Sequence, residues 1–176
     1  SQTPIKFTGE NITYDGNVYL KTNSTGVNFV QNTGQSSGSI HLGSDSSVID
    51  IRSKTTAVQI YREKIDTDGD KGDISLKGKS VYIEAVNNNG WTCGIYAGSD
   101  VTTPGNTNNT LNISSTDGTF IIAKSGVATQ AEAIVAHSGA IINIDGPLYV
   151  EASTIDGSSL GDAISTRGGA TINIGK

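Results

Sequence analysis

Cysteine, runs of basic residues and long apolar segments are scarce or absent in this 176-residue sequence, and each of these absences excludes a kind of bond or makes a partner unfavourable. Cys93 is the only cysteine, so no disulfide can form within the chain. Lys and Arg never adjoin one another and the net charge is −5, which makes nucleic acid and anionic membranes poor partners. No apolar run approaches the ~18 residues of a membrane span, so we expect no membrane insertion by this chain.

Apolar residues are also scarce, at 35% of the chain, which is low for a compact globular domain. Glycine is abundant, at 22 residues, and Ser, Thr, Asn and Asp are frequent, as tight turns require. This composition indicates an elongated molecule with a narrow core and many polar corners.

Short strand-like triplets of residues are abundant in the sequence. The clearest examples lie between residues 133 and 150, where Gly, Ser, Asp and Pro separate three triplets: Ile134-Val135-Ala136, Ile142-Asn143-Ile144 and Leu148-Tyr149-Val150. Each triplet is too short for a helix and has the period of two that a strand with one buried face requires. Three such strands joined by tight corners make one turn of a parallel β-solenoid.

The unit of three triplets recurs along the chain. First triplets start at 5, 27, 58, 95, 134 and 164, second triplets at 12, 40, 74, 111, 142 and 172, and third triplets at 18, 49, 81, 120 and 148. Their order never changes while the spacing varies, as in a solenoid whose corners extrude loops. We therefore predict a single all-β domain over residues 1–176, a right-handed parallel β-helix with three strands per coil and about six coils.

The loops that could contact a partner are expected at residues 62–73, 86–93 and 98–110. The first contains four alternating carboxylates, Asp66, Asp68, Asp70 and Asp73, which can converge on Ca²⁺. Lys71 occupies the position where the usual calcium loop has Gly, and no Glu follows at the right distance. A calcium site and a solvated acidic turn both remain open, and no other cofactor is expected.

The outward positions of the third triplets form a partly aromatic stripe. In chain order they are Tyr19, Asp50, Tyr82, Ile121 and Tyr149. Tyrosine offers a large contact area with a polar tip, which suits partner binding, but strand propensity alone also favours it on an exposed sheet. The neighbouring row is interpreted as solvated surface: Lys21, Arg52, Glu84, Ala123 and Glu151.

Two further patterns concern amides and the single tryptophan. The outward positions of later second triplets are Asn112, Asn143 and Asn173, which predicts a ladder of side-chain hydrogen bonds between strands. Trp91 stands in a polar loop beside Cys93. It is interpreted either as an anchor for a ligand or as a side chain that folds back to shield the sheet.

The sequence shows no converging set of acids, bases and nucleophiles, so we expect no enzyme. Asp50 beside Arg52 comes nearest to a site and is interpreted as a surface ion pair.

The repeat style of two segments resembles a known family. AIVAHSGAIINIDGPLYVEAS at 133–153 and DAISTRGGATINIG at 162–175 look like coils from the passenger of Gram-negative type V autotransporters. The resemblance covers the chain from about residue 27 onward, and no catalytic residue carries over. It implies a right-handed parallel β-helix displayed outside the cell at a bacterial surface, of which this chain is expected to be an N-terminal fragment.

The expected function is therefore that of a non-enzymatic adhesin fragment. It would bind a protein or glycan of a host or bacterial cell surface through Tyr19, Tyr82, Tyr149 or Trp91, or through the loops. Two alternatives are a carbohydrate-active β-helix, either a glycan-binding module or a polysaccharide lyase or hydrolase, and a purely structural stalk. Self-association also stays open.

Overall fold

The structure is a computed structural model that describes residues 5–7, 11–31, 38–62, 72–99 and 109–175. Within these ranges the chain is all β, with fifteen strands and no helix. Every pairing between the strands is parallel, and an isolated bridge between Ser153 and Leu160 is antiparallel. The described part accordingly contains no helix long and apolar enough to cross a membrane. Parallel stacking of short strands is consistent with a β-helix or solenoid.

One sheet is made by the first strand of each repeat. We call it the first-strand sheet; in order it contains β1 (Ile5–Phe7), β4 (Val27–Gln31), β7 (Thr56–Arg62), β9 (Thr92–Ser99), β11 (Ala131–His137) and β14 (Asp162–Arg167). The residues that begin the predicted first triplets, at 5, 27, 58, 95, 134 and 164, are register partners along the whole sheet. The predicted stacking of these triplets is confirmed.

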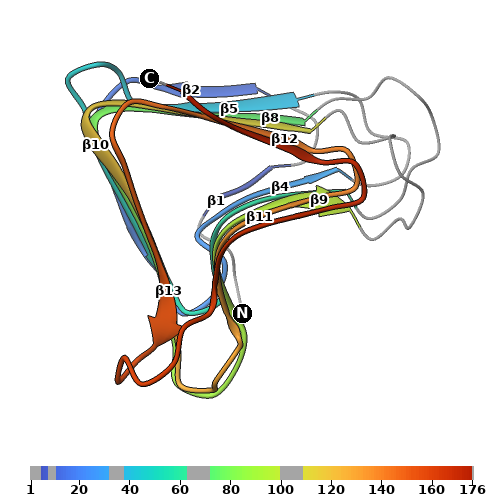
Figure 1. Ribbon diagram of the computed structural model, residues 1–176. Helices are drawn as coiled ribbons and strands as arrows, with labels where there is room; N and C mark the ends of the chain where they lie inside the picture. The colour runs from blue at the N-terminus through green and yellow to red at the C-terminus, as the bar shows by residue number, and fades with distance from the viewer. Residues whose placement is uncertain (1–4, 8–10, 32–37, 63–71, 100–108, 176) are drawn as a thin grey trace.

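The other sheet has nine strands and bends into two faces. The second-strand face comprises β2 (Asn11–Tyr14), β5 (Gly38–Leu42), the first halves of β8 (Gly72–Asn87) and β10 (Thr110–Ser125), β12 (Ile141–Asp145) and β15 (Thr171–Ile174). The third-strand face comprises β3 (Val18–Lys21), β6 (Val48–Ser53), the second halves of β8 and β10, and β13 (Leu148–Thr154). Figure 1, seen along the stack, shows the two faces meeting at a corner and the first-strand sheet closing the third side.

The core is a narrow column enclosed by these three walls. It consists of inward side chains stacked on their register partners, such as Ile51 on Ile83 in the third-strand face and Ile74 on Leu111 in the second-strand face, all fully buried. Each such side chain contributes roughly 1.5–3 kcal/mol relative to an exposed one. The low apolar fraction suffices because one residue in two faces inward along each strand.

The inward positions differ from the prediction in β10. Ile121 and Ala123 were expected to face outward, but both are fully buried, and Phe120 faces outward in place of Ile121. The sequence Phe120-Ile121-Ile122 has no alternation, so the packing decides which residue turns inward. Ile121 stacks between Ile83 and Val150, and the neighbouring inward position is Thr119.

Thr119 is polar, yet it is fully buried. Its hydroxyl group shares a 2.8 Å hydrogen bond with the hydroxyl group of Ser115 across the bend of β10. This bond satisfies both groups inside the molecule, where an unpaired hydroxyl would be costly.

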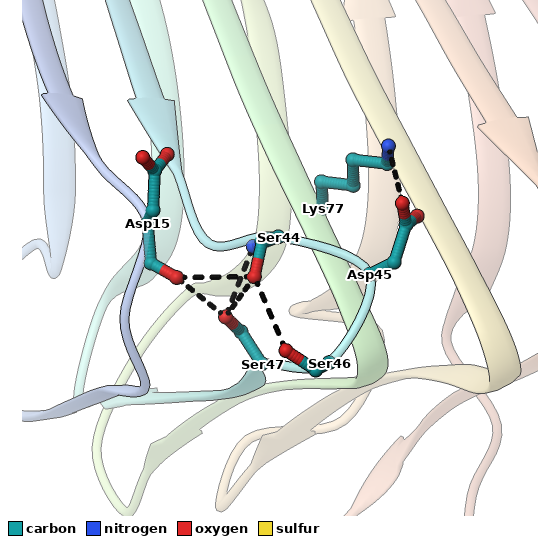
Figure 2. Close-up of polar contacts among 6 residues, drawn as sticks. All are labelled: Asp15, Ser44, Asp45, Ser46, Ser47 and Lys77. Carbon is teal, nitrogen blue, oxygen red and sulfur yellow. Dashed lines mark hydrogen bonds and ion pairs between the residues drawn. The ribbon is translucent and has the colours of Figure 1, made fainter.

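Serine hydroxyls fasten the corner between the two faces of the nine-stranded sheet (Figure 2). Ser44 Oγ and Ser47 Oγ both donate to the carbonyl oxygen of Asp15 in the preceding repeat, at 3.1 and 2.9 Å. On the other side, Lys77 Nζ donates to Asp45 Oδ2 at 2.9 Å. The corner is thereby bonded to the repeats that precede and follow it.

Candidate binding surface on the third-strand face

Outward side chains of the third-strand face stand in one continuous row across five strands. The register places Tyr19, Asp50, Tyr82, Phe120 and Tyr149 side by side, in that order. Tyr19 is 66% exposed, Tyr149 50% and Phe120 40%, while Tyr82 is half-buried. We call this set the aromatic row. Its prediction from the sequence was right at every position except the one where Phe120 replaces Ile121.

Phe120 forms ring pairs with Tyr82 on one side and with Tyr149 on the other. The ring centroids of Tyr82 and Phe120 are 6.5 Å apart and those of Phe120 and Tyr149 are 6.1 Å apart, with the rings tilted by 35° and 42°. These separations lie in the favourable range for aromatic pairs. The three side chains therefore support each other while leaving ring area open to solvent.

Carboxylates two residues further along the same strands orient two of the rings. The Tyr82 hydroxyl donates to Glu84 Oε1 and the Tyr149 hydroxyl donates to Glu151 Oε2, both at 3.1 Å. Glu151 also accepts from Lys124 and Ser153, at 3.0 Å in each case. The bond from Lys124, followed by those from Ser153 and Tyr149, lowers the pKa of the Glu151 carboxyl, so this group is ionised at neutral pH.

Arg52 links the N-terminal part of the row to Tyr82. Its guanidinium donates to both carboxylate oxygens of Asp50, at 2.8 and 3.0 Å, and lies 4.7 Å from the centre of the Tyr82 ring. Glu84 is a second, more distant ion partner at 3.7 Å. The predicted surface pair of Asp50 and Arg52 is present, and it also packs against the aromatic row through a cation–π contact.

Trp91 does not join the aromatic row. It lies against the first-strand sheet, edge-on to Tyr96 with ring centroids 6.3 Å apart, and is 39% exposed. Its Nε1 donates to Glu132 Oε2 at 2.6 Å, and Arg167 donates to the other oxygen of the same carboxylate at 3.2 Å. Of the two interpretations of Trp91, the side chain that folds back onto the sheet is the one that these contacts match.

The single cysteine of the chain is inaccessible to solvent. Cys93 is fully buried, its Sγ donates to the Ile95 carbonyl oxygen at 2.9 Å, and burial, followed by the nearby Glu132 charge, raises the pKa of its thiol well above the usual value. A thiol held in this form is a poor nucleophile.

Of the four predicted calcium ligands, only Asp73 falls within the described ranges, while Asp66, Asp68 and Asp70 lie outside the described residues. In the chain segments that are described, no three His, Cys, Asp or Glu side chains gather into a possible metal site. The predicted loops 62–73 and 98–110 are likewise largely outside these ranges. The calcium site remains a prediction.

Asp73 accepts a hydrogen bond at the end of the amide ladder that was predicted for Asn112, Asn143 and Asn173 on the second-strand face. Asn173 donates to Asn143 and Asn143 donates to Asn112, both at 2.8 Å, and Asn112 donates to Asp73 Oδ1 at 3.0 Å. The other Asp73 oxygen is 3.8 Å from His41 Nε2. Burial raises the pKa of the Asp73 carboxyl, although His41 and Asn112 act in the opposite direction. The ladder is confirmed.

Sequence reasoning missed the partners of the tyrosine hydroxyls, although a signal was there. The pattern Tyr-X-Glu occurs at Tyr82 to Glu84 and again at Tyr149 to Glu151, in strands whose residues stack in the same column. Residues two apart on a strand lie on the same face, so each pair is within reach of a hydrogen bond.

Comparison with models of known protein families, with curated proteins and with solved structures finds no match to this chain.

Proposed function

We propose that this chain is the recognition part of a surface-displayed adhesin, non-enzymatic, with the third-strand face as its binding surface. The partner would be a protein or glycan on a host or neighbouring cell. The scaffold we propose is a right-handed parallel β-helix with three strands per coil and about six coils. The parallel pairings and the three-walled outline in Figure 1 support that scaffold.

The observation that carries this proposal is that ring contacts and hydrogen bonds fix the side chains of the aromatic row in place. Large exposed rings on a rigid sheet lose little side-chain entropy when a partner binds, and the bonds of Tyr82 to Glu84 and of Tyr149 to Glu151 reduce that loss further. Tyr and Arg are also the residue types enriched at binding surfaces and their hot spots.

The state of the carboxylates on this face supports binding in preference to catalysis. A carboxyl group that acts as a general acid near neutral pH needs a raised pKa. The pKa of Glu151 is lowered, and Asp50 is bound at both oxygens by Arg52. These carboxylates serve to position Tyr149 and Arg52.

The test compares binding of the 176-residue protein with binding of a Tyr82→Ala/Tyr149→Ala double variant. Both are applied to a glycan array and to host and bacterial cells, with Ile141→Ala as a control that removes an exposed side chain from the second-strand face. We expect the double variant to lose at least about tenfold in affinity, a loss typical of hot-spot residues, while the control binds normally.

Two outcomes would contradict the proposal. Undiminished binding by a folded double variant would move recognition away from the third-strand face. If the unaltered protein bound neither cells nor glycans, a structural stalk would be the better description.

A further inference from the structure

On the third-strand face the touching rings lie in one part and the lysines without a carboxylate partner among the described residues lie in another, while a further cation, Lys124 of β10, is bound to Glu151 beside the rings. The touching rings belong to β8, β10 and β13, whereas Lys21, Arg52 and Lys54 belong to β3, β6 and the residue after β6. Both parts lie on one continuous set of paired strands. A ligand that follows the row therefore meets rings at one end and positive charge at the other.

The cationic part is a shallow hollow of about 230 Å³. Lys21, Arg52 and Lys54 line it together with one carboxylate, Glu84, so its lining is net positive on a chain whose net charge is −5. A second hollow of about 270 Å³ adjoins it and shares Lys21 and Arg52, with Tyr19 and Asp50 in its wall, so the two hollows together carry three cations and two carboxylates. Such a local excess of positive charge attracts anionic groups.

The aromatic part combines ring faces with hydrogen-bond acceptors. A hollow of about 150 Å³ lies over Phe120 and Tyr149, and the carboxylates of Glu84 and Glu151 stand beside the rings. An ionised carboxylate offers about four lone-pair directions. Tyr82 uses one of them at Glu84, whereas Tyr149, Lys124 and Ser153 together use three at Glu151, so most of the spare acceptors belong to Glu84. Rings beside spare acceptors suit a ligand with apolar C–H faces and many hydroxyl donors, which is the chemistry of a sugar ring.

From these observations we infer that the third-strand face binds a linear acidic polysaccharide lying along the stack of strands. Its sugar rings would pack on Tyr82, Phe120 and Tyr149, and its anionic groups would face Lys21, Arg52 and Lys54. This inference rests on the proposed function and names the partner class for it.

The length of the surface fits a short stretch of such a chain. Paired strands lie ~4.8 Å apart, so the distance from the strand of Lys21 to the strand of Tyr149, four steps away, is ~19 Å. A ligand must be linear to follow this track, and several sugar units fit along it.

Two other ligand classes fit less well. Single-stranded nucleic acid also stacks on rings, but it carries a phosphate at every unit and binds a positively charged groove that follows its whole backbone. Among the described residues, the hollow over Phe120 and Tyr149 has Asp117 and no cation in its lining, so a polysaccharide with an acidic group on only some of its units fits it better. A protein interface is depleted of charge at its centre. The centre of this face instead holds the ion group of Asp50, Arg52 and Glu84.

The experiment measures affinity of the 176-residue protein for three hexasaccharides by calorimetry: hyaluronan, heparin and neutral cellohexaose. We expect at least one acidic probe to bind about tenfold more tightly than cellohexaose. That preference should shrink as salt rises from about 50 mM to about 500 mM, because added ions screen exposed charges.

Double variants test separately what the cationic part and the aromatic part of the surface contribute to binding. Lys21→Ala/Lys54→Ala should lower affinity for the acidic probe about tenfold and remove most of its salt dependence. Lys77→Ala/Lys79→Ala, at the opposite end of the third strands, is the matched control with the same charge change and should bind normally. Phe120→Ala/Tyr149→Ala should weaken acidic and neutral probes alike. Thermal melting checks that each variant is folded.

Several results would overturn the inference. Equal affinity for the neutral and the acidic probes would do so. Equal losses of affinity in the Lys21→Ala/Lys54→Ala and Lys77→Ala/Lys79→Ala variants would also do so, as would tighter binding of a thymidine oligonucleotide than of the acidic probes. The protein could bind only cell-surface proteins and lose that binding in the Tyr82→Ala/Tyr149→Ala variant. That result would refute the polysaccharide inference and would still support the adhesin proposal. Absence of any binding to cells or glycans would remove both.

Discussion

At the scale of single residues, Glu132 shows how one carboxylate can hold two distant side chains. Its side chain is 15% exposed and receives Nε1 of Trp91 and the guanidinium of Arg167. Hydrogen bonds to a charged group contribute more than neutral ones, and losing the acceptor leaves the indole N–H and the guanidinium without it. Glu132 therefore helps to hold Trp91 against the first-strand sheet, together with the edge-on packing on Tyr96.

Replacing this carboxylate should loosen Trp91 and reduce stability. We expect Glu132→Ala to lower the free energy of unfolding by about 1–3 kcal/mol and to shift the fluorescence emission of Trp91 toward that of a solvated indole. Trp91 is the only tryptophan, so the emission reports this contact alone. Glu132→Gln retains an acceptor and should change both quantities less. Unchanged emission in Glu132→Ala would show that packing on Tyr96 alone holds the ring.

At the scale of elements, the amide ladder joins four successive strands of the second-strand face. Asn143 is an interior member that donates one side-chain bond and accepts another, whereas Asn173 at the end has one such bond within the ladder. Identical side chains in register make this possible because parallel stacking repeats the same geometry at every step. The ladder adds side-chain bonds to the main-chain bonds between these strands.

The two positions give an internally controlled prediction. Asn143→Ala removes two ladder bonds and should cost about 1–3 kcal/mol, while Asn173→Ala removes one and should cost about half as much. Urea unfolding of the two variants, compared with the unaltered protein, measures both. Equal costs would show that the ladder bonds contribute little and that other effects of the substitutions dominate.

At the scale of the whole molecule, stability should vary along the stack. Away from their bends, β8 and β10 bury about every second residue, and each strand has neighbours on both sides. In β14 and β15 nearly all residues are exposed, and each strand has one neighbour. A structure in which each repeat contacts only its neighbours opens most easily where such contacts are fewest.

Hydrogen exchange followed by mass spectrometry tests this expectation. Amides of β8 and β10 should exchange slowest and those of the outer strands β2, β14 and β15, which are mostly exposed and have one neighbour each, should exchange fastest. Uniform protection along the chain would contradict it and would indicate one cooperative unit. A rigid centre is also what the proposed binding surface needs, because the row from Tyr82 to Tyr149 lies on β8, β10 and β13.

Sequence alone determined which residues stack. The triplets beginning at Val27 and at Ile40 predicted their register partners along each sheet, because short alternating strands can bury their apolar residues only by stacking them. The amide ladder and most of the aromatic row followed from the same spacing.

Only the tertiary structure decided which side chains face inward, and which distant residues meet, where the local sequence pattern makes no choice. Phe120 faces outward because Ile121 fills the core between Ile83 and Val150, a choice that three successive apolar residues cannot make by themselves. Trp91 and Glu132 are 41 residues apart in the sequence, and they form a hydrogen bond because β11 pairs with β9 one repeat later. Such contacts depend on how strands are placed in space, and the local sequence does not encode that placement.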